Sequence, residues 1–84
     1  MAASTSDIRR WFIEGKKDGV THMIVVCDSF DWSNYPVYVK AGENPREIAS
    51  GYNGKDMQKV MEVYNLSMDM DKQLNSKTMV MNYD

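Results

Sequence analysis

The run VTHMIVVC, residues 20–27, places the strongest constraint on how this 84-residue chain can fold. It is rich in β-branched residues and too short for a convincing helix, so it predicts a strand. Successive side chains of a strand point to opposite faces, and apolar residues occur here on both. We therefore expect a strand that is central in its sheet or covered on both faces by other elements.

An amphipathic helix is predicted before this strand, over about residues 6–18. Ile8, Trp11 and Phe12 recur at three- and four-residue steps, which is the spacing of one helix face. Gly19 follows at a position where glycine commonly ends a helix.

After the first strand, the segment PVYVK, residues 36–40, predicts a second one. Pro36 is expected at its first position, because proline cannot donate a hydrogen bond within a sheet. The loop between the two strands has about eight residues, and a parallel crossover needs about a dozen or more. The two strands are therefore expected to pair antiparallel.

The second half of the chain predicts two more helices. Asn44 and Pro45 begin the first of them, as N-cap and first helical residue. The second is predicted over about residues 55–65 from apolar residues at helical steps, namely Met57, Val60, Met61 and Tyr64. Residues 66–70 then alternate between apolar and polar, which suggests a short third strand.

These elements predict a single domain over residues 1–84, because a chain of this length rarely holds two independent cores. The predicted fold class is α+β, in the order α-β-β-α-α, with a small antiparallel sheet packed against helices.

Composition argues against several classes of function. The chain carries 10 Lys and Arg against 12 Asp and Glu, and its net charge is -2. No run of basic residues exceeds two, so the basic surface that nucleic-acid binding requires is not apparent. No apolar run approaches the roughly 18 residues of a membrane span. We therefore expect no membrane partner and a cytoplasmic location.

No catalytic residue, cofactor or metal site is predicted. His22 and Cys27 are five positions apart on the predicted strand, which places them on opposite faces. A single cysteine also excludes an internal disulfide and a multi-cysteine zinc site. The sequence contains no phosphate-binding loop and no nucleophile elbow. A non-enzymatic role is therefore favoured over an enzyme.

The loop CDSFDWSNYP, residues 27–36, carries three aromatic rings and two carboxylates. Rings beside aspartates, on a loop braced by two strands, suit an interface anchor with a polar rim. Trp32 is expected to be partly exposed, whereas folding back onto the core is the alternative for Phe30 and Tyr35. The predicted recognition surface for a protein partner consists of Asp28, Phe30, Asp31, Trp32 and Tyr35.

Two alternatives stay open. Asp28 and Asp31 follow an apolar strand, where carboxylates could bind a divalent cation or a small molecule, or act as acid and base. Aspartates in such loops more often cap backbone amides. The segment TMVMNY, residues 78–83, is β-prone and could join the sheet of a second copy, which would make a homo-oligomer.

Two spans, IRRWFIEGKKDGVTHMIVVCDSFDWSNYPVYV and MQKVMEVYNLSMD, together resemble small uncharacterised proteins found in bacteria and their phages. The resemblance covers about residues 8–70. It implies a bacterial or phage setting in the cytosol, with no activity attached. Because phage proteins of this size often bind and block a host or defence protein, it also implies an inhibitor or accessory factor.

Overall fold

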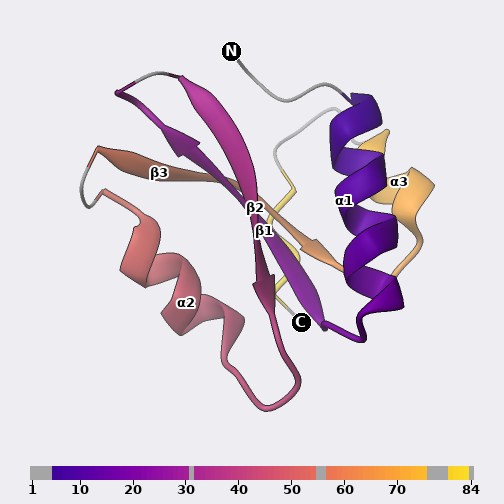
Figure 1. The fold of residues 1–84 in the computed structure, drawn as a ribbon. Helices are drawn as coiled ribbons and strands as arrows, with labels where there is room; N and C mark the ends of the chain where they lie inside the picture. Colours follow the sequence, from indigo (N-terminus) through magenta and orange to yellow (C-terminus); the bar gives the residue numbers. More distant parts are fainter. Residues whose placement is uncertain (1–4, 31, 55–56, 76–79, 84) are drawn as a thin grey trace.

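The computed structural model describes residues 5–30, 32–54, 57–75 and 80–83 (Figure 1). The elements are helix α1 (Thr5–Lys17), strands β1 (His22–Asp28) and β2 (Ser33–Val39), helix α2 (Pro45–Tyr52), strand β3 (Gln58–Asn65) and helix α3 (Met70–Leu74). The predicted α+β class is confirmed, but the order is α-β-β-α-β-α. Within the described residues, no helix combines the length and the apolar character needed to cross a membrane.

The three strands form one antiparallel sheet in the order β2-β1-β3, so β1 is the central strand. Its residues 23–27 are all buried. Helices α1 and α3 lie on one face of the sheet and α2 lies on the other (Figure 1). Strand β1 is therefore both central and covered on its two faces, which confirms the prediction for the run 20–27.

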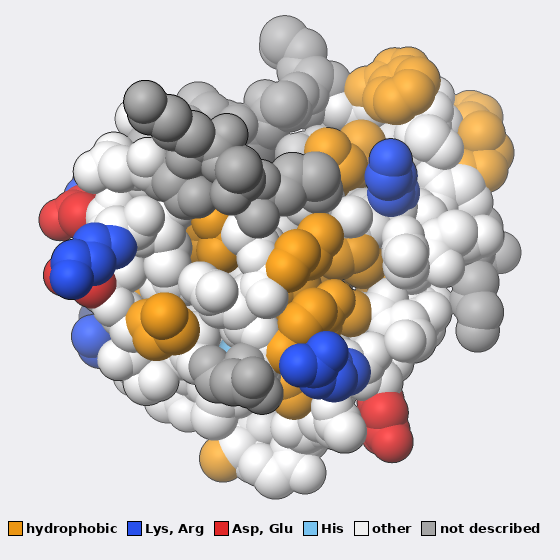
Figure 2. Space-filling view, turned by 180° about the vertical axis from the view of Figure 1, so that it is seen from behind, with side chains coloured by type: hydrophobic (Ala, Val, Ile, Leu, Met, Phe, Trp, Pro, Cys, Tyr) orange, Lys and Arg blue, Asp and Glu red, His pale blue; other side chains and the backbone are white. Residues whose placement is uncertain are grey.

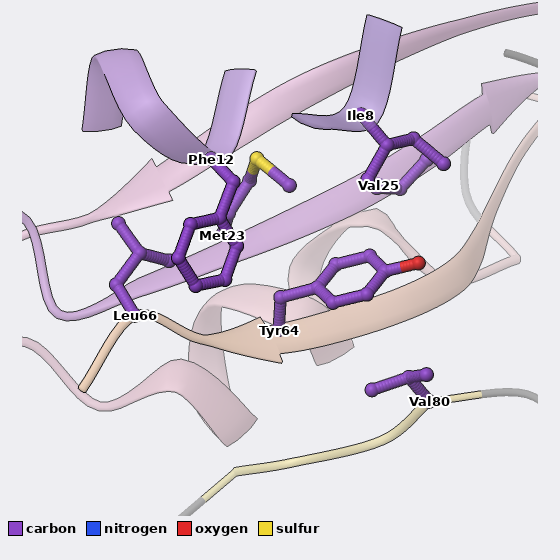
Figure 3. Packing of buried hydrophobic residues seen from close by; sticks show 7 residues of the cluster. All are labelled: Ile8, Phe12, Met23, Val25, Tyr64, Leu66 and Val80. Atoms are coloured by element: carbon purple, nitrogen blue, oxygen red, sulfur yellow. The ribbon is translucent and has the colours of Figure 1, made fainter. Parts of the chain in front are cut away.

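Each face of the sheet carries its own hydrophobic cluster, because alternate residues of β1 point to opposite sides. The cluster under α1 consists of Ile8, Phe12, Met23, Val25, Tyr64, Leu66 and Val80 (Figure 3). The rings of Phe12 and Tyr64 meet edge to face in it, with centroids 6.5 Å apart. The cluster under α2 consists of Ile24, Val26, Val39, Ala49, Val60 and Val63.

Gly15 allows α1 to approach the sheet closely. A Cβ atom at this position would lie 2.7 Å from the Tyr38 ring and 3.0 Å from the Leu66 side chain. The same contact is fixed by the Tyr38 hydroxyl, which donates to the Trp11 carbonyl at 3.0 Å.

The helix predicted over residues 55–65 is wrong, because residues 58–65 form strand β3. The register against β1 shifts between Val25 and Val26. Val25 lies opposite Glu62, whereas Val26 lies opposite Val60. One extra residue therefore stands in β3, which is the arrangement of a β-bulge.

This bulge explains why the segment has a helical pattern. The extra residue is Met61, and it reverses the alternation of side chains along β3. As a result Val60 and Val63 enter the cluster under α2, although they are three positions apart. Met61 and Tyr64, also three apart, both pack on the α1 side. Apolar residues three apart on both faces mimic the spacing of a helix.

The third strand suggested near residues 66–70 is also wrong. Residues 66–69 form a turn, and α3 begins at Met70. Asp69 caps the helix, because its Oδ1 accepts a hydrogen bond from the Lys72 amide at 3.0 Å. The sheet gains its third strand from β3 instead.

Residues 80–82 run parallel to the outer edge of β3. The Val63 amide donates to the Val80 carbonyl at 2.7 Å, and the Asn82 amide donates to the Val63 carbonyl at 2.9 Å. This part of the segment that could have joined a second copy thus pairs with the sheet of its own chain.

Strand β2 begins at Ser33, so Pro36 lies inside the strand and not at its start. The backbone of Val63 bonds to residues 80 and 82, outside the three-stranded sheet, and so makes no bond to its β1 neighbour Ile24. Because the backbone groups of successive residues in a strand point to opposite edges, Ile24 bonds to β2 and Val25 bonds to β3. Pro36, opposite Val25, therefore turns its nitrogen to the outside of the sheet. Proline at this position therefore loses no hydrogen bond to β1. Because proline has no N–H, the outer edge of β2 also has one donor fewer.

The buried side chain of Gln73 connects the end of β3, helix α3 and the C-terminal segment. Its Oε1 accepts from the Asn65 amide and from Asn82 Nδ2, both at 2.9 Å. Its Nε2 donates to the carbonyls of Asn65, at 2.9 Å, and Asp69, at 3.1 Å. All four hydrogen-bonding positions of the amide are therefore used.

Replacing Gln73 by Met keeps much of the volume and removes these four bonds. We expect the free energy of unfolding to fall by about 2–4 kcal/mol, because the buried backbone groups of Asn65 lose their partner. Urea denaturation measures the change. Lys72→Met, on the exposed side of the same helix, is the control and is expected to stay within about 0.5 kcal/mol. Equal effects of the two substitutions would contradict the role assigned to Gln73.

Stability is expected to decline at alkaline pH because of Tyr64. Burial of its ring, assisted by the Glu62 carboxylate, raises the pKa of Tyr64 far above its ordinary value. A raised folded-state pKa means that stability is complete below about pH 10 and decreases above it. Above about pH 10, the free energy of unfolding of Tyr64→Phe should decrease with pH less steeply than that of the wild type. The two slopes should differ by about 1.4 kcal/mol per pH unit. Urea denaturation between about pH 8 and 11 tests this, and parallel pH profiles would refute it.

Candidate functional site

The β1–β2 loop and the residue before β3 meet at one end of the sheet. Asp28, the last residue of β1, lies opposite Ser33 of β2 and Gln58 of β3. Ser29 joins the loop to the start of β3, because its amide and its Oγ both donate to the Met57 carbonyl, at 2.7 and 2.6 Å. The two connections therefore form one hydrogen-bonded unit.

The backbone of the loop is fixed by Asp28. The Asp28 Oδ1 accepts from the Phe30 amide at 2.9 Å, and the Asp28 carbonyl accepts from the Trp32 amide at 2.7 Å. The first bond is an Asx-turn, the structural role that aspartates most often have in such loops. With β2 beginning at Ser33, the loop is residues 29–32, shorter than the sequence predicts.

Three large apolar side chains protrude at this end of the sheet. Phe30 is 76% exposed, Trp32 64% and Met57 57%, the highest values for large hydrophobic residues in the described part of the chain. We call these three residues the apolar corner. Figure 2 shows hydrophobic side chains protruding at the upper right, where the β1–β2 loop lies in that view.

Two of these residues also occupy left-handed backbone positions. Trp32 has φ 61° and Met57 has φ 62°, and no other non-glycine residue among those described has a positive φ. The left-handed conformation costs an L-residue about 1–2 kcal/mol, so glycine and asparagine usually fill such positions. Bulky apolar side chains thus stand where both the backbone and the solvent disfavour them.

The predicted site residues fall into different environments. Trp32 is exposed, as expected, and Phe30 is exposed too, so the alternative that its ring folds back onto the core is wrong. Tyr35 is half-buried against the cluster under α2, and its hydroxyl accepts from Gln58 Nε2. Asp31 lies outside the described residues.

The environment of Tyr35 also affects its ionisation. Burial, followed by the nearby Tyr52 and Asp28, raises the pKa of Tyr35. A phenol held neutral in this way serves as a packing and hydrogen-bonding group at the base of the loop.

Met57 was missed by reasoning from the sequence. The spacing from Met57 to Val60 and Met61 assigns it to the apolar face of a helix. In the structure it precedes β3, and its backbone bonds to Ser29 turn it toward the loop. The sequence signal that could have found it is the Asn-Gly pair at residues 53–54, which marks a turn just before it.

Among the described residues, no arrangement of side chains supports the alternative metal or acid-base site at Asp28 or a pair of His22 with Cys27. Asp28 uses one carboxylate oxygen for the Phe30 amide. Within the described ranges, no three His, Cys, Asp or Glu side chains gather closely enough to hold a metal ion. His22 begins β1 while Cys27 lies near its other end, on the opposite face of the sheet.

Comparison with family models, with curated proteins and with solved structures finds no match to this chain. Function is therefore inferred from the geometry of the apolar corner.

The backbone conformation of the corner predicts an unusual response to glycine. Trp32→Gly and Met57→Gly should leave the free energy of unfolding unchanged or raise it by up to about 1 kcal/mol, because glycine relieves the left-handed strain. Met68→Gly is the control, since Met68 is exposed and has no positive φ. That substitution should cost about 0.5–1 kcal/mol. Chemical denaturation of the three variants measures this, and a loss above about 1 kcal/mol at both corner positions would refute the strain argument.

Proposed function

We propose that this chain is a small non-enzymatic protein-binding module, and that the apolar corner is its recognition surface. The observation that carries the proposal is Trp32, whose indole is largely exposed on a left-handed backbone. Strained backbone concentrates at functional sites, where the cost is retained for the sake of the side chain it positions.

The chemistry of the corner supports recognition of a protein. Trp and aromatic residues dominate the energetics of protein interfaces, and methionine adapts its shape to a partner. Phe30, Trp32 and Met57 therefore combine two rigid rings with one flexible side chain. Their backbones are already fixed by the bonds of Asp28 and Ser29, which lowers the entropy lost on binding.

The surroundings of the corner narrow the kind of partner. Asp28 lies at its base, Asp31 stands in the same loop in the sequence, and no Lys or Arg occurs between residues 27 and 39. Lys59 of β3 is exposed two residues after Met57, so the described corner carries charges of both signs without a basic cluster. A surface without a basic cluster disfavours nucleic acid and anionic lipid. We further propose that the module acts in the cytoplasm as an inhibitor or accessory factor, which is what the resemblance to small bacterial and phage proteins implies.

Capture from a bacterial lysate tests the proposal. Immobilised wild-type chain should retain at least one protein that Trp32→Gly retains roughly ten-fold less, because a central aromatic anchor contributes about 1.4 kcal/mol or more. Quantitative mass spectrometry of the retained proteins measures the ratio. The glycine variant is suitable because its fold is expected to be at least as stable as that of the wild type.

Two further variants sharpen the comparison. Met68→Ala removes an exposed apolar side chain in the β3–α3 turn and should leave capture unchanged. Asp28→Asn keeps an oxygen that can accept from the Phe30 amide but removes the charge, so it should weaken capture less than Trp32→Gly does. Identical sets of retained proteins for the wild type and Trp32→Gly would refute the proposed function.

A further inference from the structure

We infer that Met57 is a site of reversible oxidation, and that hydrogen peroxide weakens recognition by the apolar corner when it converts this thioether to a sulfoxide. The inference rests on the proposed function, because it concerns the same recognition surface. It adds a covalent modification and a chemical signal that controls that surface.

Met57 is the most exposed methionine in the described part of the chain. It is 57% exposed, against 46% for Met68 and 41% for Met81. Met23, in the cluster under α1, is fully buried. Because oxidation follows solvent access, peroxide reaches the sulfur of Met57 without any opening of the fold.

The backbone of Met57 is held next to the β1–β2 loop. Its carbonyl accepts two hydrogen bonds from Ser29, one from the amide at 2.7 Å and one from Oγ at 2.6 Å. Its φ of 62° lies in the left-handed region, which few L-residues adopt. A sulfoxide formed at Met57 therefore remains part of the surface that contains Phe30 and Trp32.

The other two exposed methionines lie outside the corner. Met68 is in the β3–α3 turn, and Met81 pairs with Val63 at the outer edge of β3. Their oxidation changes surfaces that the corner does not include, so they are internal controls on the position of the modification. The thiol of Cys27 is buried, which leaves Met57 as the accessible sulfur at this end of the sheet.

The oxidation transfers one oxygen atom from peroxide to the Met57 Sδ. The sulfur lone pair attacks one peroxide oxygen, and the S–O bond forms as the O–O bond breaks. The second oxygen takes up the proton of the first and leaves as water. The sulfur loses two electrons and the peroxide gains them. Methionine sulfoxide reductases reverse the change with a dithiol, which becomes a disulfide while the oxygen leaves as water.

A sulfoxide reverses the contribution of Met57 to an interface. The thioether is apolar and adapts its shape to a partner, whereas the sulfoxide is polar and chiral. Burying a polar group without a hydrogen-bond partner is unfavourable, so the affinity of the corner falls. The fold stays intact, because the side chain of Met57 is exposed and its bonds to Ser29 come from the backbone.

Oxidation of the full chain with hydrogen peroxide, followed by peptide mass spectrometry, measures the reactivity of each methionine. We expect Met57 to be oxidised at least about ten-fold faster than Met23, because only the former is open to solvent. Met68 and Met81 should react within about a factor of three of Met57. The urea midpoint of the chain should stay the same.

Capture from a desalted bacterial lysate then measures the effect on recognition. The immobilised wild-type chain is oxidised and freed of peroxide. It is compared with its untreated form for the proteins whose retention depends on Trp32. Oxidation should lower their retention about five-fold, which is the expected effect of one polar group buried in an interface. Treatment with methionine sulfoxide reductases and dithiothreitol should restore it.

Three substitutions assign the effect to one sulfur, and each variant is compared with its own untreated sample. Met57→Leu has no sulfur at the corner, so peroxide should leave its capture unchanged. Met68→Leu removes an exposed sulfur outside the corner and should lose capture on oxidation as the wild type does. Met57→Gln, which places a polar side chain of similar length on the same backbone, should lower capture without peroxide.

The possible results separate this inference from the proposed function. Oxidation of Met57 no faster than Met23, unchanged capture by the oxidised wild type, or an equal loss in Met57→Leu would each overturn the inference and leave the proposed function in place. A loss of capture with a lowered urea midpoint would also overturn it, because unfolding would then be the cause. Capture that is independent of Trp32 before any oxidation would overturn both.

Discussion

Burial of β1 on both faces determines how the rest of the chain is arranged. A strand with apolar side chains on both sides needs two covering layers, and the chain supplies α1 with α3 on one side and α2 on the other. The neighbours β2 and β3 satisfy its backbone on both edges. Since β1 is central, its last residue, Asp28, stands beside the connections to both neighbours. The apolar corner is therefore a consequence of where the central strand ends.

The same strand explains which parts of the fold could be predicted. Helix α1, strand β1 and the start of α2 carry local signals, such as the three- and four-residue spacing of Ile8, Trp11 and Phe12 and the Asn44 cap, which bonds to the Arg46 amide. Those signals act within a few residues and need no knowledge of the tertiary structure.

Strand β3 could not be predicted, because its periodicity depends on a contact distant in sequence. The bulge at Met61 exists only against β1, and without β1 the spacing of Val60, Val63 and Tyr64 is helical. Of the candidate site, the exposure of Trp32 could be predicted from its polar neighbours. The contribution of Met57 could not, because it arises from a hydrogen bond to Ser29, which is 28 residues away.

The Gln73 network has a consequence for local opening. Helix α3 has five residues, too few to be stable alone, and residues 80–82 form one isolated bridge. The Gln73 side chain bonds to Asn65 at the end of β3 and to Asn82 of the C-terminal segment, so detachment of either segment breaks the bond that joins the two. We expect the two segments to behave as one foldon, whose amides exchange with solvent deuterium together and before those of β1.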